Sequence, residues 1–203
     1  MPHHGVLRGS STTTKLRVIF DGSSRRTFQP SLNEELSAGP ALQNDFPTII
    51  TRWRCYRIGF TADIEKMFRQ INVTREHQKY QQILWRDSDS KDINIYNLTT
   101  VTYGTKPAPF LSIRVLQQLA LNEKEQFPFA CKVLNTDTYV HDVISGADDL
   151  TQALKLHSEL CTLLNKENLI YVNGLLTLWI SWNLFCLNYE QILKFLKLQM
   201  IIL

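Results

Sequence analysis

Apolar and polar residues alternate in several short stretches, and this period of two predicts β-strands. The clearest is Lys15-Leu16-Arg17-Val18-Ile19-Phe20-Asp21, which ends at the turn residues Gly22-Ser23-Ser24. We expect strands at residues 15–21, 57–63, 68–73, 80–86 and 93–103. Residues 1–14 and 25–40 are polar or rich in turn residues, so they are predicted to be loops.

Three other stretches carry apolar residues at helical spacing, which predicts amphipathic helices. They cover residues 45–54, 107–122 and 148–164. Asp45 is a suitable N-cap, and Pro107 stands near the first turn of the second helix. The pair Asp148-Asp149 could suggest metal binding, but acids favour a helix N-terminus, so capping is the preferred interpretation.

A hairpin is predicted at Thr138-Tyr139-Val140-His141-Asp142-Val143-Ile144. β-Branched and aromatic residues flank a polar pair, which places His141 and Asp142 at the tip. A second acid, Asp63, ends the apolar strand at residues 57–63. If the two strand ends face each other, their carboxylates form a site for divalent metal ions and a nucleoside triphosphate.

Residues 168–189 contain no charged side chain, and their length would permit one membrane span. Asn173, Gly174, Thr177 and Asn183 interrupt the apolar run, and polar groups are costly in lipid. Buried strands and a helix are the preferred interpretation. A membrane anchor remains the alternative.

The composition is that of a globular protein: 203 residues, 44% hydrophobic and 20% charged, with a net charge of +3. The positive charge is concentrated in residues 1–86, which hold thirteen lysines and arginines against seven acids. A basic region suits a polyanion, although a solvated surface has the same composition. The four cysteines are scattered and no signal peptide opens the chain, so we expect an intracellular protein, cytoplasmic or nuclear.

Taken in order, these segments resemble the reverse transcriptases of Pao/BEL-type LTR retrotransposons. The resemblance covers about residues 2–165 and rests on the following segments: Pro2-His3-His4-Gly5-Val6, Leu16-Arg17-Val18-Ile19-Phe20-Asp21-Gly22-Ser23, Leu32-Asn33, Gly39-Pro40, Thr61-Ala62-Asp63-Ile64-Glu65-Lys66-Met67-Phe68, Gln82-Ile83-Leu84-Trp85-Arg86, Val101-Thr102-Tyr103-Gly104-Thr105, Ala108-Pro109-Phe110 and Tyr139-Val140-His141-Asp142. It implies an α+β fold in which residues 1–165 form the fingers and palm of a right-hand polymerase, an antiparallel sheet backed by helices. Residues 166–203 would be a diverged or truncated C-terminal tail.

The resemblance also implies an RNA-directed DNA polymerase that acts on an RNA template, a DNA primer and dNTPs. Asp63, the backbone carbonyl of Ile64 and Asp142 would bind two Mg²⁺ ions. The dNTP would be held by Arg17, Phe68, Tyr103 and Gly104, with Phe68 beneath the sugar. For Phe68 and Tyr103, core packing is the open alternative. Four basic residues could face the template and primer: Arg25, Arg26, Arg52 and Arg54.

One departure bears on activity. The family hairpin reads Tyr-x-Asp-Asp, whereas this chain has His141 where a metal-binding aspartate is expected. An imidazole removes a negative charge from a site that must hold dications, so we expect little or no polymerase activity. A non-catalytic remnant that binds nucleic acid is one alternative. A membrane-tethered protein that uses residues 168–189 is another, but no membrane is expected.

Overall fold

The computed structural model describes residues 1–7, 9, 15–166, 169, 171–172 and 176–178, the last two ranges by their backbone alone. The chain forms two compact units. The first unit consists of Met1–Leu42 and Lys66–Val115, and the second of Gln43–Glu65 and Leu116–Leu203. The candidate carboxylates belong to the second unit.

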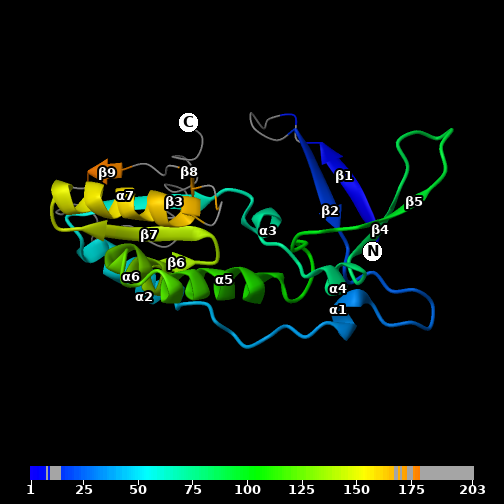
Figure 1. The fold of residues 1–203 in the computed structure, drawn as a ribbon, viewed down its shortest axis with the longest axis horizontal. Helices are drawn as coiled ribbons and strands as arrows, with labels where there is room; N and C mark the ends of the chain where they lie inside the picture. Colours follow the sequence, from blue (N-terminus) through cyan, green and yellow to red (C-terminus); the bar gives the residue numbers. More distant parts are fainter. Residues whose placement is uncertain (8, 10–14, 167–168, 170, 173–175, 179–203) are drawn as a thin grey trace. The chain divides into compact units, whose positions relative to one another are not determined.

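The second unit is built on a five-stranded antiparallel sheet in the order β6-β7-β3-β8, with β9 also paired to β3 (Figure 1). Its strands are β3 (Ile58–Ile64), β6 (Thr138–Tyr139), β7 (Asp142–Ala147), β8 (Tyr171–Val172) and β9 (Leu176–Leu178). Strand β3 is central because β7 pairs along one of its edges while β8 and β9 pair along the other. Five of its seven residues are buried, so its burial does not alternate as an exposed sheet face would require.

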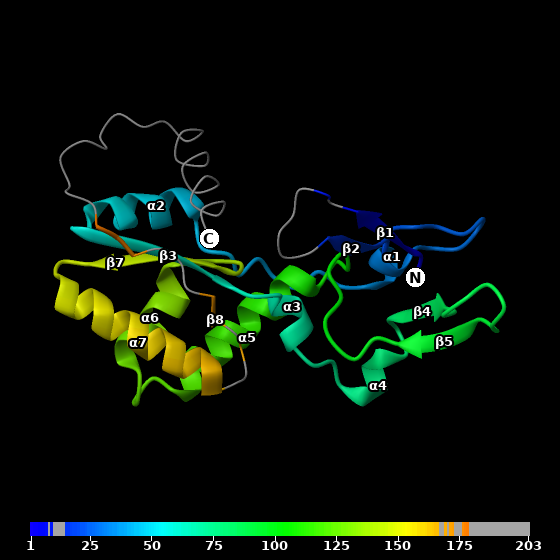
Figure 2. The ribbon, with the colours of Figure 1, turned by 90° about the horizontal axis from the view of Figure 1, so that it is seen from above.

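Helices cover both faces of this sheet. Helix α2 (Phe46–Cys55) lies on one side, and α6 (Pro128–Thr136) and α7 (Leu150–Lys166) lie on the other (Figure 2). On the α2 side, Ile49, Ile50 and Trp53 pack against Ile144 of β7. On the opposite side, Ile58 and Ala147 meet Ala153 of α7. Neighbouring strand residues thus point to alternate sides, as the pleat of a sheet requires.

Helix α5 (Ala108–Asn122) runs from the first unit into the second. Its buried residues are Ala108, Ser112, Leu116, Leu119 and Ala120. The predicted helices at residues 45–54, 107–122 and 148–164 correspond to α2, α5 and α7. Both predicted caps are confirmed: Asp45 accepts the Thr48 N–H at 3.0 Å, and Asp149 accepts the Gln152 N–H at 2.8 Å.

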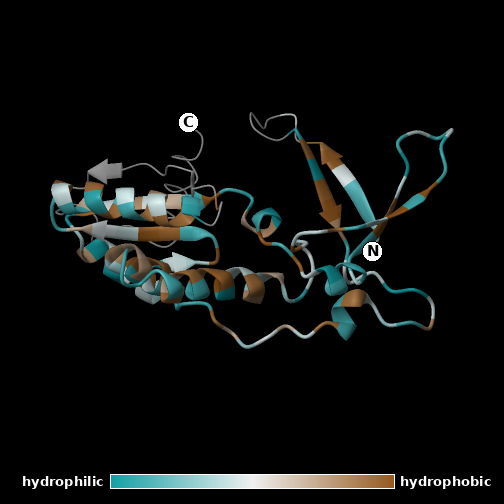
Figure 3. Ribbon diagram, viewed as in Figure 1, coloured by the Kyte–Doolittle hydropathy of each residue, from teal (hydrophilic) through white to brown (hydrophobic). Residues whose placement is uncertain are grey.

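The first unit contains two separate antiparallel pairs, β1 (His3–Leu7) with β2 (Leu16–Phe20) and β4 (Gln82–Trp85) with β5 (Asn94–Asn97). Its short helices are α1 (Leu32–Glu35), α3 (Met67–Gln70) and α4 (Arg75–Gln78). The β1–β2 pair contains hydrophobic residues, whose ribbon is brown in Figure 3, and two of them are exposed: Leu7 is 79% and Leu16 55% exposed.

Four local predictions are wrong. The alternating residues 68–73 include helix α3, because four residues are too few to separate the two periods. The strand predicted at residues 93–103 is reduced to β5. The predicted N-terminal loop contains β1, and the loop predicted at residues 25–40 contains α1. Helix α1 is held by a capping box between Ser31 and Glu34.

Most of residues 166–203, predicted to be a diverged tail, lies outside the described residues. The backbone of β8 and β9 shows that the parts described pair with β3. Within the described part of the chain, no helix has the length and apolar character that a bilayer crossing requires. Residues 168–189, for which buried strands and a helix are predicted and a membrane anchor is the alternative, lie mainly outside the described residues, so both interpretations stay open.

Candidate active site

Backbone pairing brings the two predicted carboxylates together. In the antiparallel register of β3 and β7, Asp63 stands opposite Asp142, and Thr61 stands opposite Ile144. Directly opposed residues point to the same side of a sheet, so both carboxylates lie on the α2 side. Tyr139 of β6 is the next residue in this row, because it pairs with Asp142 from the other edge. Its ring lies 5.0 Å from that of Phe46 on α2.

The turn between β6 and β7 consists of Val140 and His141. Asp142 is already the first residue of β7, so the predicted hairpin tip is displaced by one residue. Val140 has φ +59°, and both common types of two-residue hairpin turn, I′ and II′, require a positive φ at the first loop position. A β-branched residue is strained in this conformation. The carbonyl of His141 accepts the Ile64 N–H at 3.1 Å, which ties the turn to the end of β3.

The side chains of Asp63, His141 and Asp142 form one cluster. Each offers a ligand atom, and these atoms all lie within 4.8 Å of one another. His141 Nε2 is 3.9 Å from Asp63 Oδ1. The side chains of His141 and Asp63 are 45% and 53% exposed, so an ion could reach them from solvent. The imidazole Nδ1 is enclosed and has no hydrogen-bond partner among the described residues.

Both carboxyl groups hold their protons more tightly than a free aspartate. Partial burial raises the pKa of Asp63; the neighbouring His141 opposes this effect, and Asp142 adds to it. Burial also raises the pKa of Asp142, again against the influence of His141. The common cause is that desolvation penalises the charged form. A bound cation would reverse this effect, because it stabilises both carboxylates.

The donor set fits a cation site in part. Asp63 and Asp142 supply the hard anionic oxygens that Mg²⁺ prefers, whereas His141 supplies a nitrogen that Mg²⁺ does not favour. Ile64, whose carbonyl is the other predicted ligand, is buried at 1% exposure. Two carboxylates and one imidazole suit a single ion better than the pair of Mg²⁺ ions predicted from the resemblance.

A cleft of about 690 Å³ lies in the first unit, and three of the four predicted dNTP-binding residues line it: Phe68, Tyr103 and Gly104. Gly104 has φ +87°, and a Cβ there would lie 2.5 Å from the Phe20 carbonyl oxygen. The hydroxyl of Tyr103 donates to the Val18 carbonyl, and its ring packs edge-on against Phe20 at 5.2 Å. Arg17 lies on the exposed part of β2, opposite Val6.

The cleft depends on Asn33, to which the sequence analysis assigned no role. Its amide donates to Ser23 Oγ at 2.9 Å and to the Gly104 carbonyl at 3.0 Å. Its side-chain oxygen accepts the Lys106 N–H at 2.7 Å. One side chain therefore joins three segments that line the cleft. The signal was present, since Leu32-Asn33 and Gly22-Ser23 are among the segments that carry the resemblance.

The four basic residues predicted to face nucleic acid have different surroundings. Arg25 lines the cleft and forms an ion pair with Glu34. Arg26 and Arg54 are exposed. Arg52 forms an ion pair with the buried Asp137 and donates to the Thr136 carbonyl at 2.8 Å. The contacts of Arg52 thus account for its presence without nucleic acid, and its binding role stays a prediction.

No protein-family model matches the chain, and no curated protein matches it. Solved structures of foamy-virus protease-reverse transcriptase do. A crystal structure of the Prototype Foamy Virus enzyme, a CSH mutant, matches with a TM-score of 0.60 and 18% identity over 85% of this chain and 19% of that one. The complex with double-stranded DNA matches with a TM-score of 0.64 and 16% identity over 88% of this chain and 28% of that one. The complex with an RNA/DNA hybrid matches with a TM-score of 0.60 and 16% identity over 85% of this chain and 19% of that one.

The chain thus spans 19–28% of the length of these viral proteins. At such low identity the likeness concerns the fold and does not extend to activity. The protein therefore has a reverse-transcriptase-like fold of mixed α/β structure.

Proposed function

We propose that this chain is the fingers and palm fragment of a retroelement reverse transcriptase of the Pao/BEL type, with polymerase activity impaired by His141. The observation that carries the proposal is the pairing of Asp63 with Asp142 on a sheet whose fold resembles that of a viral reverse transcriptase. Two carboxylates on one face of paired strands can share a cation. The motif segments named from the sequence support the retroelement origin.

Each residue has a stated role in this proposal. Asp63, the Ile64 carbonyl and Asp142 would hold Mg²⁺, which when bound activates the primer 3′-hydroxyl and stabilises the leaving pyrophosphate. Arg17 would contact the triphosphate, since its planar guanidinium matches phosphate oxygens. Phe68 would lie beneath the sugar and exclude a 2′-hydroxyl by its bulk. Tyr103 and Gly104 would contact the nucleotide and the template base.

The position of His141 explains why we expect impairment. A ring nitrogen of His141 lies within 4.8 Å of carboxylate oxygens of both aspartates, which supports a ligand position for His141. A neutral or positive group there cannot supply the missing negative charge. Losing one electrostatic contact at a reacting centre typically lowers the rate by about 10²–10³-fold.

The direct test is primer extension on an RNA template with purified protein, its His141→Asp variant and the double variant His141→Asp/Asp63→Asn. We expect extension by His141→Asp at least about 100-fold above that of the unchanged chain, since the variant restores the carboxylate. The double variant should lose it again. Equal and strong extension by the unchanged chain and His141→Asp would contradict the impairment.

A non-catalytic nucleic-acid-binding function is the second candidate. It is favoured by His141 in the carboxylate cluster and by the net positive charge of residues 1–86. It predicts template–primer binding that weakens steeply with salt and needs no Mg²⁺. Salt-sensitive binding without extension by His141→Asp would favour this candidate. If the chain neither extends a primer nor binds template–primer, both functions are wrong.

A further inference from the structure

The cluster at the β6–β7 turn differs from a magnesium site in one ligand. Mg²⁺ takes oxygen ligands in a near-octahedral arrangement and gives up water reluctantly. Imidazole nitrogen instead suits zinc, cobalt and nickel. We propose that Asp63, His141 and Asp142 form a site for one first-row transition-metal ion, such as Zn²⁺ or Co²⁺, which binds there in preference to Mg²⁺. The proposal does not depend on polymerase descent, because the same three ligands are present whatever the activity.

The distances suit a single ion. Zinc lies about 2.0–2.2 Å from imidazole nitrogen and carboxylate oxygen, so two of its ligand atoms in a tetrahedral site are roughly 3.4 Å apart. His141 Nε2 and Asp63 Oδ1 are 3.9 Å apart, which is close to this separation. The largest separation in the cluster is within 4.8 Å. The side chains of His141 and Asp63 are about half exposed and so have room for the small rotation that closes the site.

The local charge also favours a cation. Asp63 and Asp142 face the same side of the sheet, and among the described residues no lysine or arginine forms an ion pair with either. His141 is the one ion-pair partner of Asp63 in that part of the chain. A dication would offset the repulsion between the two carboxylates, a role that no ion-paired lysine or arginine fills among the described residues.

The orientation of the imidazole supports the same ligand assignment. Nε2 is directed at Asp63, whereas Nδ1 is enclosed and has no hydrogen-bond partner among the described residues. A metal-bound histidine coordinates through one nitrogen and carries its proton on the other. Here Nε2 is the ligand and Nδ1 bears the proton. Metal ligands usually have a partner at the second nitrogen, so we expect moderate rather than tight affinity.

The test is titration of the EDTA-treated full chain, freed of chelator, with Co²⁺ alone. Visible absorption bands report inner-sphere binding, and Zn²⁺ or Mg²⁺ is then added as competitor. Other nitrogen and sulfur donors complicate this measurement, among them His3, His4 and the exposed Cys55. All variants are therefore made in a His3→Gln/His4→Gln/Cys55→Ser background.

We expect one Co²⁺ per chain, displaced by Zn²⁺ at a concentration at least about 100-fold lower than that of Mg²⁺. His141→Gln and Asp142→Asn should each weaken binding by about 10–100-fold. His157→Gln is the matched control, because His157 and Cys161 on α7 lie 3.8 Å apart and together could compete for the metal ion. It should leave binding unchanged. His141→Asp should narrow the preference for Zn²⁺ over Mg²⁺, because it replaces the imidazole nitrogen with a hard oxygen.

Three results would overturn the proposal: Co²⁺ binding that survives both His141→Gln and Asp142→Asn, binding lost in His157→Gln, or equal displacement by Mg²⁺ and Zn²⁺. Circular dichroism establishes that each variant is folded. If His141→Gln unfolds, Asp142→Asn alone decides the outcome. The readout is an absorption spectrum, so a failure of primer extension leaves the metal result intact.

Discussion

Asp63 and Asp142 are held side by side by backbone pairing between β3 and β7, without a lysine or arginine countercharge in the described part of the chain. Their proximity is therefore a consequence of the sheet register, which the core on both faces maintains. Such an arrangement lowers the stability of the metal-free protein when both carboxyl groups are ionised.

This cost predicts a pH dependence. The folded pKa values of Asp63 and Asp142 are raised above the ordinary value of 3.8, so the folded state binds protons more tightly than the unfolded state. The contribution of these two groups to stability is greatest below about pH 4 and is lost as the pH rises through their folded pKa values. With EDTA present, Asp63→Asn should therefore be more stable than the unchanged chain at pH 7, by at most about 1 kcal/mol because the site is half exposed.

Urea unfolding at pH 7 and pH 4 checks this prediction. The advantage of Asp63→Asn should shrink at pH 4. Asp92→Asn, in the loop before β5, is the control for losing an exposed carboxylate and should show no such dependence. A constant difference at both pH values would mean that the electrostatic account of the pair is wrong.

The turn residue Val140 predicts a stabilising substitution. Its φ of +59° is unfavourable for a β-branched side chain, whereas asparagine tolerates this region. Val140→Asn should raise the free energy of unfolding by about 1 kcal/mol. Val143→Asn is the contrast: Val143 is fully buried in β7, and its replacement should destabilise the protein. Loss of stability in Val140→Asn would contradict the assigned strain.

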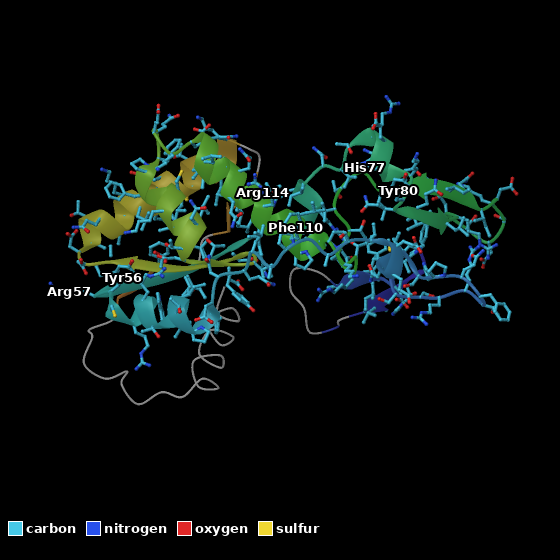
Figure 4. All side chains as sticks on the ribbon, turned by 90° about the horizontal axis from the view of Figure 1, so that it is seen from below. Tyr56, Arg57, His77, Tyr80, Phe110 and Arg114 are labelled. Atoms are coloured by element: carbon cyan, nitrogen blue, oxygen red, sulfur yellow. The ribbon has the colours of Figure 1, made fainter. Side chains whose placement is uncertain are left out.

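Arg52 should matter for the stability of the second unit. Asp137 is 3% exposed and receives hydrogen bonds from Ser145 and Thr136 in addition to its ion pair with Arg52. Arg52→Met would leave a buried carboxylate without its cation, at a cost of about 2 kcal/mol. Arg57 is the exposed residue before β3 (Figure 4). Arg57→Met removes the same charge and should leave the free energy of unfolding nearly unchanged in chemical denaturation.

Gly104 should be intolerant of any side chain. Its φ is positive, and the Phe20 carbonyl oxygen is 2.5 Å from the position that a Cβ would take, so both features oppose substitution. Gly104→Ala should destabilise the first unit by about 2–3 kcal/mol. Gly9→Ala is the control, because a Cβ on Gly9 meets nothing within 4 Å. Equal melting temperatures for the two variants would show that the Phe20–Gly104 contact is not tight.

Sequence patterns were sufficient for the described helices of ten residues or more, whereas α6, with nine residues, was not predicted. Helices α2, α5 and α7 were predicted because each is long enough for its apolar residues to define one face. The four-residue helices α1 and α3 were missed, since so short a stretch fits either period. Strand β1 was missed because its polar His3-His4 gives no alternation. The two acids and His141 were identified as candidates, and their assigned roles stay predictions.

The amino-acid sequence by itself determined which residues could carry chemistry, because residue type decides whether a side chain can bind a cation. It also determined the resemblance to a reverse transcriptase, through short motifs in order. Only the tertiary structure decided that Asp63 and Asp142 point to one side of one sheet and that His141 joins them. It also decided that Asn33 joins three segments of the cleft. These relations depend on strand register and on contacts between residues far apart in the chain, which no local pattern encodes.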